Sequence, residues 1–330
     1  MLLARTPLRV SLFGGGTDYP EYFRQRRGAV LGLAIDKYIY IAMLPMSGIQ
    51  AYHFRIAYSQ IELVDRAEEI QHRAVRAAFQ HYGIDAAMDV SIMADMPASA
   101  GLGSSSSFSV GLLSLIAQLR DERLTKLDLA LRAIRLERDL LGDNVGVQDQ
   151  LHAAFGGINR FDFDARDYRI TPIMMRGECL EYLTQSMLLV YTGVQRHASK
   201  VVATQIERTQ SGAIDPQLER MLALVDEAQE VLRERTPKTM LERLGTLLDT
   251  TWHLKRSLSP EVSSSGIDAL YAQALSLGAL GGKLCGAGGG GFLLMLVPPE
   301  QRSTFIEGMA PNRVIPVGLD TQGSTIIHSS

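Results

Sequence analysis

The sequence is poor in cysteine and tryptophan, with two and one among 330 residues, and it has no long hydrophobic run. Cys179 and Cys285 stand far apart, outside any C-x-x-C or Cys/His cluster, which argues against a disulfide framework or structural zinc. No apolar segment approaches the roughly 20 residues that span a bilayer. The N-terminus has no apolar signal core followed by a cleavage site. These absences predict a cytoplasmic protein that is not a membrane protein.

An excess of either charge is also missing, since 33 basic residues stand against 36 acidic ones and the pI is about 6.2. No overall field therefore recruits nucleic acid, and an anionic ligand has to meet local positive groups. The length suits two domains. The acidic, turn-rich stretch Asp162–Asp167 predicts a division into residues 1–165 and 166–330. The mixture of strands and helices predicts an α+β fold.

Glycine, in contrast, is abundant and clustered, and the most informative cluster lies in PASAGLGSSSSFS at residues 97–109. Gly101 and Gly103 let the backbone approach an anion closely, and the serines place N–H groups and hydroxyls at a helix start. The apolar spacing of Val110, Leu113 and Ala117 predicts a buried helix. An ordinary turn and N-cap is the alternative interpretation. The Walker A pattern is absent, since Leu284 follows Gly282-Lys283.

A second cluster lies in LRVSLFGGGTDYPEY near the N-terminus, where a predicted strand, three glycines and a short helix follow one another. Arg9 lies on the strand, and Asp18 stands at the helix entrance. The glycines permit a tight turn and close approach of a ligand. A structural interpretation is equally open, because Asp18 and Glu21 have the spacing of a capping box and Arg9 has that of a surface strand residue.

Two carboxylates flank a third glycine-containing turn. Glu137 falls near the end of a helix predicted over about 125–141, and Asp149 near the start of one predicted over about 147–154. Phosphoryl transfer uses such a pair, one carboxylate for the metal and one to accept or orient the hydroxyl proton. The alternative is that Glu137, within RLERD, lies on a solvated helix face.

The last cluster, KLCGAGGGGFLLML, formally satisfies G-x-G-x-x-G with Gly286, Gly288 and Gly291. A dinucleotide-binding fingerprint has to open a helix after its strand. Here the apolar run Phe292–Val297 predicts a buried strand instead. We therefore reject an oxidoreductase fold and interpret the cluster as a connector that packs against another loop.

In chain order, the N-terminal, serine-rich and C-terminal glycine clusters resemble the three motifs of the GHMP kinases, and together they span nearly the whole chain. The resemblance implies the two-domain GHMP fold, with a ribosomal-protein-S5-domain-2-like N-terminal part, a ferredoxin-like C-terminal α/β sandwich and a cleft between them. TPLRVSLFGGGTDYPEY, YTGVQRHASKV and KLCGAGGGGF look most similar to the D-glycero-D-manno-heptose 7-phosphate kinases and their anomeric sugar kinase relatives. GGGTDY stands where galactokinases have G-E-H-T-D-Y, which argues against galactose.

The resemblance also implies residue roles. Asp149, in GVQDQ, matches the catalytic aspartate, and Arg9 matches its partner. Glu137 matches the magnesium-binding glutamate, completed by a serine of the run Ser104–Ser106, with Ser105 as our candidate. The implied ATP-binding residues are Pro97, Gly101, Leu102, Gly103, Ser104, Ser105 and Ser106. The implied substrate-binding residues are Gly15, Gly16, Thr17, Asp18, Tyr19, Arg196, Gly286, Ala287 and Gly288.

The function implied is transfer of the γ-phosphoryl group of ATP, with Mg²⁺, to the anomeric hydroxyl of a sugar, best matched by heptose 7-phosphate. A distal phosphate needs cations, and the resemblance favours Arg196 among the candidates Arg196, His197, Lys200, Lys255 and Arg256. The role of Lys283 is open. Other acceptors, such as an unphosphorylated sugar or a fucose, galactose or octose derivative, stay open, as do a sugar and ATP sensor and a homodimer.

Overall fold

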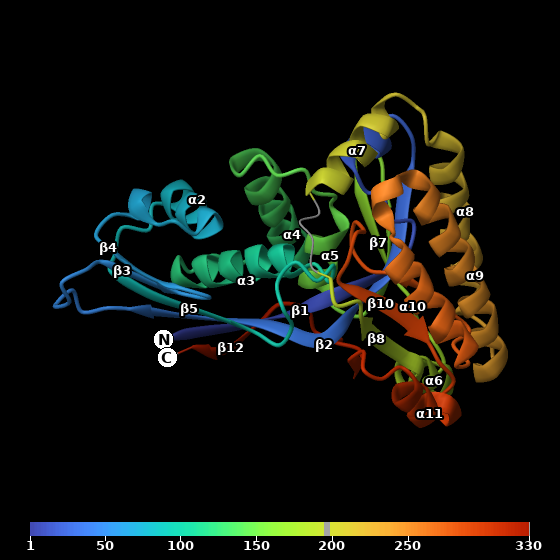
Figure 1. Cartoon of the computed structure of the whole chain (residues 1–330). Helices are drawn as coiled ribbons and strands as arrows, with labels where there is room; N and C mark the ends of the chain where they lie inside the picture. The colour runs from blue at the N-terminus through green and yellow to red at the C-terminus, as the bar shows by residue number, and fades with distance from the viewer. Residues whose placement is uncertain (195–198, 330) are drawn as a thin grey trace.

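Two β-sheets with flanking helices make up the protein in a computed structural model that describes residues 1–194 and 199–329 (Figure 1). The large sheet contains β1 (Leu2–Phe13), β2 (Gly28–Pro45), β3 (Phe54–Ala57), β4 (Ile61–Val64), β5 (Met88–Ala94), β6 (Ile158–Phe163), β7 (Tyr168–Pro172) and β12 (Thr325–Ser329). The small sheet contains β8 (Met187–Tyr191), β9 (Gly281–Leu284), β10 (Phe292–Leu296) and β11 (Val314–Pro316). The mixture confirms the predicted α+β class.

Eleven α-helices are present in the described part of the chain. They are α1 (Pro20–Phe23), α2 (Arg73–Tyr82), α3 (Ser104–Leu119), α4 (Lys126–Arg135), α5 (Gln148–Phe155), α6 (Gly177–Ser186), α7 (Ser199–Gln210), α8 (Asp215–Val231), α9 (Pro237–Leu258), α10 (Ser265–Ser276) and α11 (Arg302–Gly308). None of the helices described has the length and apolar character needed to cross a bilayer.

The long strand β2 organises the large sheet. It is rich in β-branched and aromatic residues, which favour a pleated strand. It pairs with β1 along most of its length, with β6 over residues 28–33 and with β5 over residues 39–45. The C-terminal strand β12 returns to pair with β1, so the two chain ends lie side by side (Figure 1).

The helix after the serine loop, α3, packs on β1 and β2 and is buried on nearly every side, as its apolar spacing predicts. Its first residue is Ser104, preceded by Gly103 in a left-handed conformation. A positive φ is accessible to glycine at little steric cost. The loop therefore delivers a free helix N-terminus next to β1.

The small sheet has the antiparallel order β11-β8-β10-β9. In sequence numbering of its four strands this is 4-1-3-2, the order of the ferredoxin-like sandwich that the resemblance implies. The run FLLML forms β10 and is buried on both faces, because Leu294 joins the main core while Leu293 joins a second core around Trp252. The strand interpretation of this run is confirmed.

The sequence-based division at residue 165 falls in the turn between β6 and β7, which pair with each other. Strands β7 and β12 follow that turn in sequence but join the large sheet. The division into residues 1–165 and 166–330 stays a prediction, and the large sheet takes strands from both sides of it.

Helix α9 approaches β9 at backbone distance through Gly245. A Cβ atom built on Gly245 would lie 2.7 Å from both Cβ and the carbonyl oxygen of Leu280. Alanine is normally the better helix residue by about 1 kcal/mol. We predict the reverse here: Gly245→Ala lowers the free energy of unfolding by about 1–3 kcal/mol through overpacking.

Urea denaturation of Gly245→Ala beside Gly177→Ala measures this effect. Gly177 begins α6 and has no atom within 4 Å of its built Cβ, so its variant should match the wild type or exceed it slightly. Equal stability of the two variants would contradict the close approach.

Candidate active site

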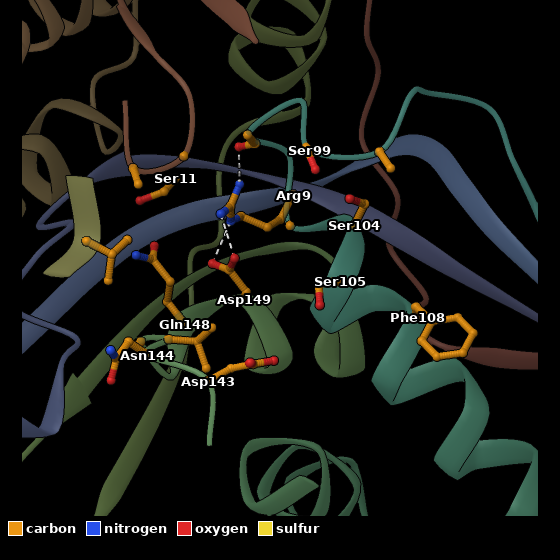
Figure 2. A pocket seen from close by; sticks show the side chains of 18 of the residues that line it. Arg9, Ser11, Ser99, Ser104, Ser105, Phe108, Asp143, Asn144, Gln148 and Asp149 are labelled. Carbon is orange, nitrogen blue, oxygen red and sulfur yellow. Dashed lines mark hydrogen bonds and ion pairs between the residues drawn. The ribbon is translucent and has the colours of Figure 1, made fainter. Parts of the chain in front are cut away.

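A cavity of about 900 Å³ opens where the three glycine clusters meet, and elements of both sheets line it. Figure 2 shows Arg9 and Asp149 facing each other in its middle, with Ser11 and Gln148 on one side and Ser104, Ser105 and Phe108 on the other. The sequence places these residues far apart. The fold brings them to one cleft.

Arg9 connects two walls of the cavity through its guanidinium group. Its Nε and Nη2 atoms donate to the two carboxylate oxygens of Asp149 at 2.7 and 2.6 Å, and its Nη1 donates to the carbonyl oxygen of Gly101 at 2.7 Å. Such two-pronged arginine–carboxylate pairs are among the strongest hydrogen bonds in proteins. Burial lowers the pKa of Arg9, but Asp149 and other nearby anions outweigh burial and raise it. Arg9 therefore keeps a full positive charge beside Asp149.

Hydrogen bonds from the buried side chain of Thr17 stabilise the first glycine turn. The Thr17 hydroxyl donates to the carbonyl oxygens of Gly14 and Ala29, and Thr17 is fully buried behind the cavity wall. Asp18 lines the cavity and accepts from the backbone N–H of Gly16 at 2.9 Å. Burial raises the pKa of Asp18, and this hydrogen bond opposes the rise. Thr17 thus shapes the turn, whereas Asp18 presents a carboxylate to the cavity.

Glu137 is deeply buried rather than on a solvated helix face. Helix α4 continues into a π-helical turn over Leu136–Leu140, a rare geometry that is frequent at functional sites. One carboxylate oxygen of Glu137 accepts from Ser106 at 2.8 Å and from Gln150 at 2.7 Å, and the other forms no hydrogen bond of good geometry with a described residue. Burial raises the pKa of Glu137 to about 7, while the nearby side chains of Ser109, Ser106 and Gln150 oppose the rise. Glu137 lies behind the cavity wall and contacts Ser106, not Ser105.

The serine loop forms one wall. Gly101, Gly103, Ser104 and Ser105 line the cavity, whereas Pro97, Leu102 and Ser106 do not. Ser105 is exposed at the N-terminus of α3, where several N–H groups have no partner within the helix. This part of the predicted phosphate loop has the geometry of an anion site.

The C-terminal glycine cluster packs against the serine loop, as the connector interpretation predicts. A Cβ atom on Gly286 would lie 2.6 Å from Cα of Gly101, and one on Gly101 would lie 2.6 Å from the carbonyl oxygen of Cys285. Only glycine permits this contact. Gly286 and Ala287 line the cavity, and Gly288 instead faces Val262.

Two buried lysines also belong to this wall. Lys255, from α9, donates to the carbonyl oxygens of Leu284 and Gly286. Lys283, from β9, donates to those of Ser11 and Leu12 at 2.7 and 3.1 Å. Burial lowers the pKa of Lys283 to about 8 and that of Lys255 well below its ordinary value. Lys255 thereby connects α9 to the glycine loop, and Lys283 connects β9 to β1. Both lysines line the cavity.

An aromatic cluster forms the end of the cavity beyond Ser105. The His72 ring lies 5.0 Å from that of Tyr58 and 4.8 Å from that of Phe108, between centroids. Burial lowers the pKa of His72, so the ring is neutral near pH 7. Sequence reasoning missed this end, as it missed Ser11 and Gln148, although Ser11 follows Arg9 by the two-residue period of a strand face.

Some of the predicted binding residues are not part of the cavity lining as the structure describes it. Arg196 and His197 lie outside the described residues, as does the Lys200 side chain. Arg256 forms an ion pair with Asp268 at 2.7 Å and is absent from the cavity lining.

Comparison with known proteins agrees with this architecture. Residues 53–157 match the GHMP kinases N terminal domain, and residues 232–313 match GHMP kinases C terminal. The chain belongs to the GHMP kinases, and the family that its motifs resemble is confirmed.

Individual proteins of known name are similar to the chain over most of its length. The chain is 27% identical over 92% of both sequences to the D-glycero-alpha-D-manno-heptose 7-phosphate kinase of Campylobacter jejuni. It is 28% identical over 88% of both to the galactokinase of Thermococcus kodakarensis. The solved structure of a D-glycero-D-manno-heptose 1-phosphate kinase from Bacteroides thetaiotaomicron superposes with a TM-score of 0.79, covers all of both chains and is 21% identical. That last likeness concerns the fold.

The buried Glu137 predicts a pH-dependent stability. Its pKa rises from 4.5 to about 7 on folding, so the folded state retains a proton that the unfolded chain releases. Stability therefore falls as pH rises from about 4.5 to 7. At about 1.4 kcal/mol per pH unit, Glu137→Gln should gain up to about 3 kcal/mol relative to the wild type between pH 5 and 8.

Urea denaturation of both proteins at several pH values, with a chelator present, measures this difference. The glutamine keeps the size of the side chain and an oxygen for Ser106. Parallel stability curves for the two proteins would contradict a raised Glu137 pKa.

Proposed function

We propose that this protein is an ATP-dependent sugar kinase that phosphorylates an anomeric hydroxyl, with a D-glycero-D-manno-heptose 7-phosphate as the acceptor best supported. The observation that carries the kinase proposal is the Arg9–Asp149 pair, which lies between the serine loop and the first glycine turn. The acceptor rests on the motifs quoted above and on the heptose 7-phosphate kinase among the relatives.

In this proposal Asp149 accepts or orients the proton of the attacking hydroxyl, and Arg9 holds the Asp149 carboxylate in place through two hydrogen bonds and offsets negative charge that develops on the phosphoryl group. The N–H groups at the start of α3 bind the phosphates of ATP. The aromatic cluster around His72 packs against the adenine base of ATP. Asp18 accepts hydrogen bonds from sugar hydroxyls. Catalysis is then mainly positioning and charge neutralisation.

The donor set fits a magnesium ion in its chemistry. Mg²⁺ prefers carboxylate and hydroxyl oxygens, and one buried oxygen of Glu137 has no described partner. We propose that Glu137 and a serine of the run 104–106 hold the ion, which would neutralise phosphate charge. Ser105 faces the cavity and Ser106 contacts Glu137, so both stay candidates.

Lys255 and Lys283 are the described cations, besides Arg9, that line the cavity. Two buried amino groups with only carbonyl acceptors favour an anionic ligand, because an anion would stabilise their protonated forms. Their place beside the contact of Gly101 and Gly286 supports a role near the phosphoryl groups. In this proposal a distal phosphate on the acceptor would be bound further from the phosphoryl groups than Lys255 and Lys283 are.

Asp149→Asn is predicted to retain nucleotide binding while turnover falls by roughly 10²–10⁴-fold, because the amide neither accepts the proton nor pairs with Arg9 as an anion. Calorimetric titration with Mg-ATP and a coupled ADP-release assay separate the two properties. Turnover near that of the wild type would contradict the assignment of Asp149.

The proposal as a whole is tested by ADP release with Mg-ATP across heptose 7-phosphate, mannose, galactose, fucose and mevalonate, with phosphorus NMR of the product. We expect a new anomeric phosphate on the heptose. Turnover only with another acceptor would support kinase activity but overturn heptose 7-phosphate as the acceptor. Saturable ATP binding without any turnover would overturn the proposed kinase activity.

A further inference from the structure

Two buried polar groups on the side of the cavity opposite to Ser105 have no assigned role. Ser11 and Gln148 are only 9% and 8% exposed, and both line the cavity. No described residue forms a hydrogen bond with Oγ of Ser11 or Oε1 of Gln148. Figure 2 shows both side chains directed to the same region beside Arg9. Buried polar atoms in proteins nearly always have a partner, so two such atoms at one cavity wall call for an explanation.

Gly15 marks the point where the two groups converge. A Cβ atom built on Gly15 would lie 3.6 Å from Oγ of Ser11 and 3.8 Å from Nε2 of Gln148, with nothing closer. Gly15 is not among the glycines that have a positive φ. The turn therefore has room for a small group at this point and no conformational need for glycine.

The chemistry of the point is that of a hydroxyl site. The Gln148 amide already interacts with Asp18. A hydroxyl can donate to Oε1 of Gln148 while it accepts from the hydroxyl of Ser11, whereas a methylene satisfies neither group. Ser11 follows Arg9 by two residues on the same strand face, a separation of about 7 Å along β1. A hydroxyl bound here is therefore a different one from that held at Asp149.

We propose that Ser11, Gly15 and Gln148 form a subsite that binds a second, non-reacting hydroxyl of the acceptor, so that the enzyme selects polyhydroxylated substrates. This inference rests on the proposed sugar kinase function and names residues that determine its specificity. A site built to hydrogen-bond a hydroxyl rejects acceptors that lack it, because its own buried polar groups are then left unpaired.

Ser11→Ala separates this role from a structural one. Removal of a buried hydroxyl without a partner should leave the melting temperature unchanged or raise it. Loss of one neutral hydrogen bond should raise KM for the sugar about 3- to 10-fold, with kcat changed less and the Mg-ATP affinity unchanged. A hydroxyl with only a structural role would instead lower the melting temperature on removal and leave KM unchanged.

Gly15→Ala fills the subsite with a methyl group. The surroundings of the built Cβ allow folding, so we expect wild-type nucleotide affinity and a KM for the sugar raised about tenfold or more. Gly177→Ala, remote from the cavity, is the matched control and should leave both unchanged.

Monodeoxy analogues of the accepted sugar complete the test. For the analogue that lacks the bound hydroxyl, the KM of the wild type should equal or exceed that of Ser11→Ala, because the wild type gains no hydrogen bond and leaves the Ser11 hydroxyl unpaired. Wild-type turnover on a sugar with no change in KM for Ser11→Ala or Gly15→Ala would overturn the subsite alone. Wild-type protein that phosphorylates no sugar would overturn the proposed function, and the subsite with it.

Discussion

The structure of the cavity depends on Arg9. Its backbone N–H donates to the carbonyl oxygen of Leu102, its guanidinium donates to that of Gly101, and its remaining donors hold Asp149. One residue on β1 thus connects the serine loop to the start of α5. Since a buried guanidinium is tolerated only when it is paired and hydrogen-bonded, these partners are constrained as strongly as Arg9 itself.

Glycine extends this constraint to the small sheet. Gly101 accepts from Arg9 and also meets Gly286 at a distance that no side chain permits. Lys255 in turn holds the carbonyl oxygen of Gly286 from the end of α9. A continuous set of contacts therefore runs from Asp149 through Arg9 and both glycine loops to a helix of the other half. Asp149 and the packing of α9 are thus linked by direct contacts.

Much of this arrangement was predictable from sequence, because local signals carried it. Glycine clusters marked the loops, the period of apolar residues gave α3, and an unbroken apolar run gave β10. Glu137 was ambiguous for a physical reason: RLERD looks like a solvated face at 3.6 residues per turn, and only the π-helical turn directs Glu137 inward. The strands β3 and β4 are four residues each, too short for a period to show. His72 meets Tyr58 and Phe108 through tertiary structure alone.

Four titratable groups in or behind the cavity wall share one electrostatic trend. Burial raises the pKa of Asp18 and of Glu137 and lowers that of Lys255 and of Lys283, so acids and bases all shift toward their neutral forms. A low-dielectric cleft produces both effects because it disfavours charge of either sign. A magnesium ion at Glu137 and phosphate groups at the lysines would supply the missing opposite charges and reverse both shifts. The binding of nucleotide and metal is thereby expected to be linked to proton release at the carboxylate and proton uptake at the amines, with Arg9, charged throughout, as the fixed reference between them.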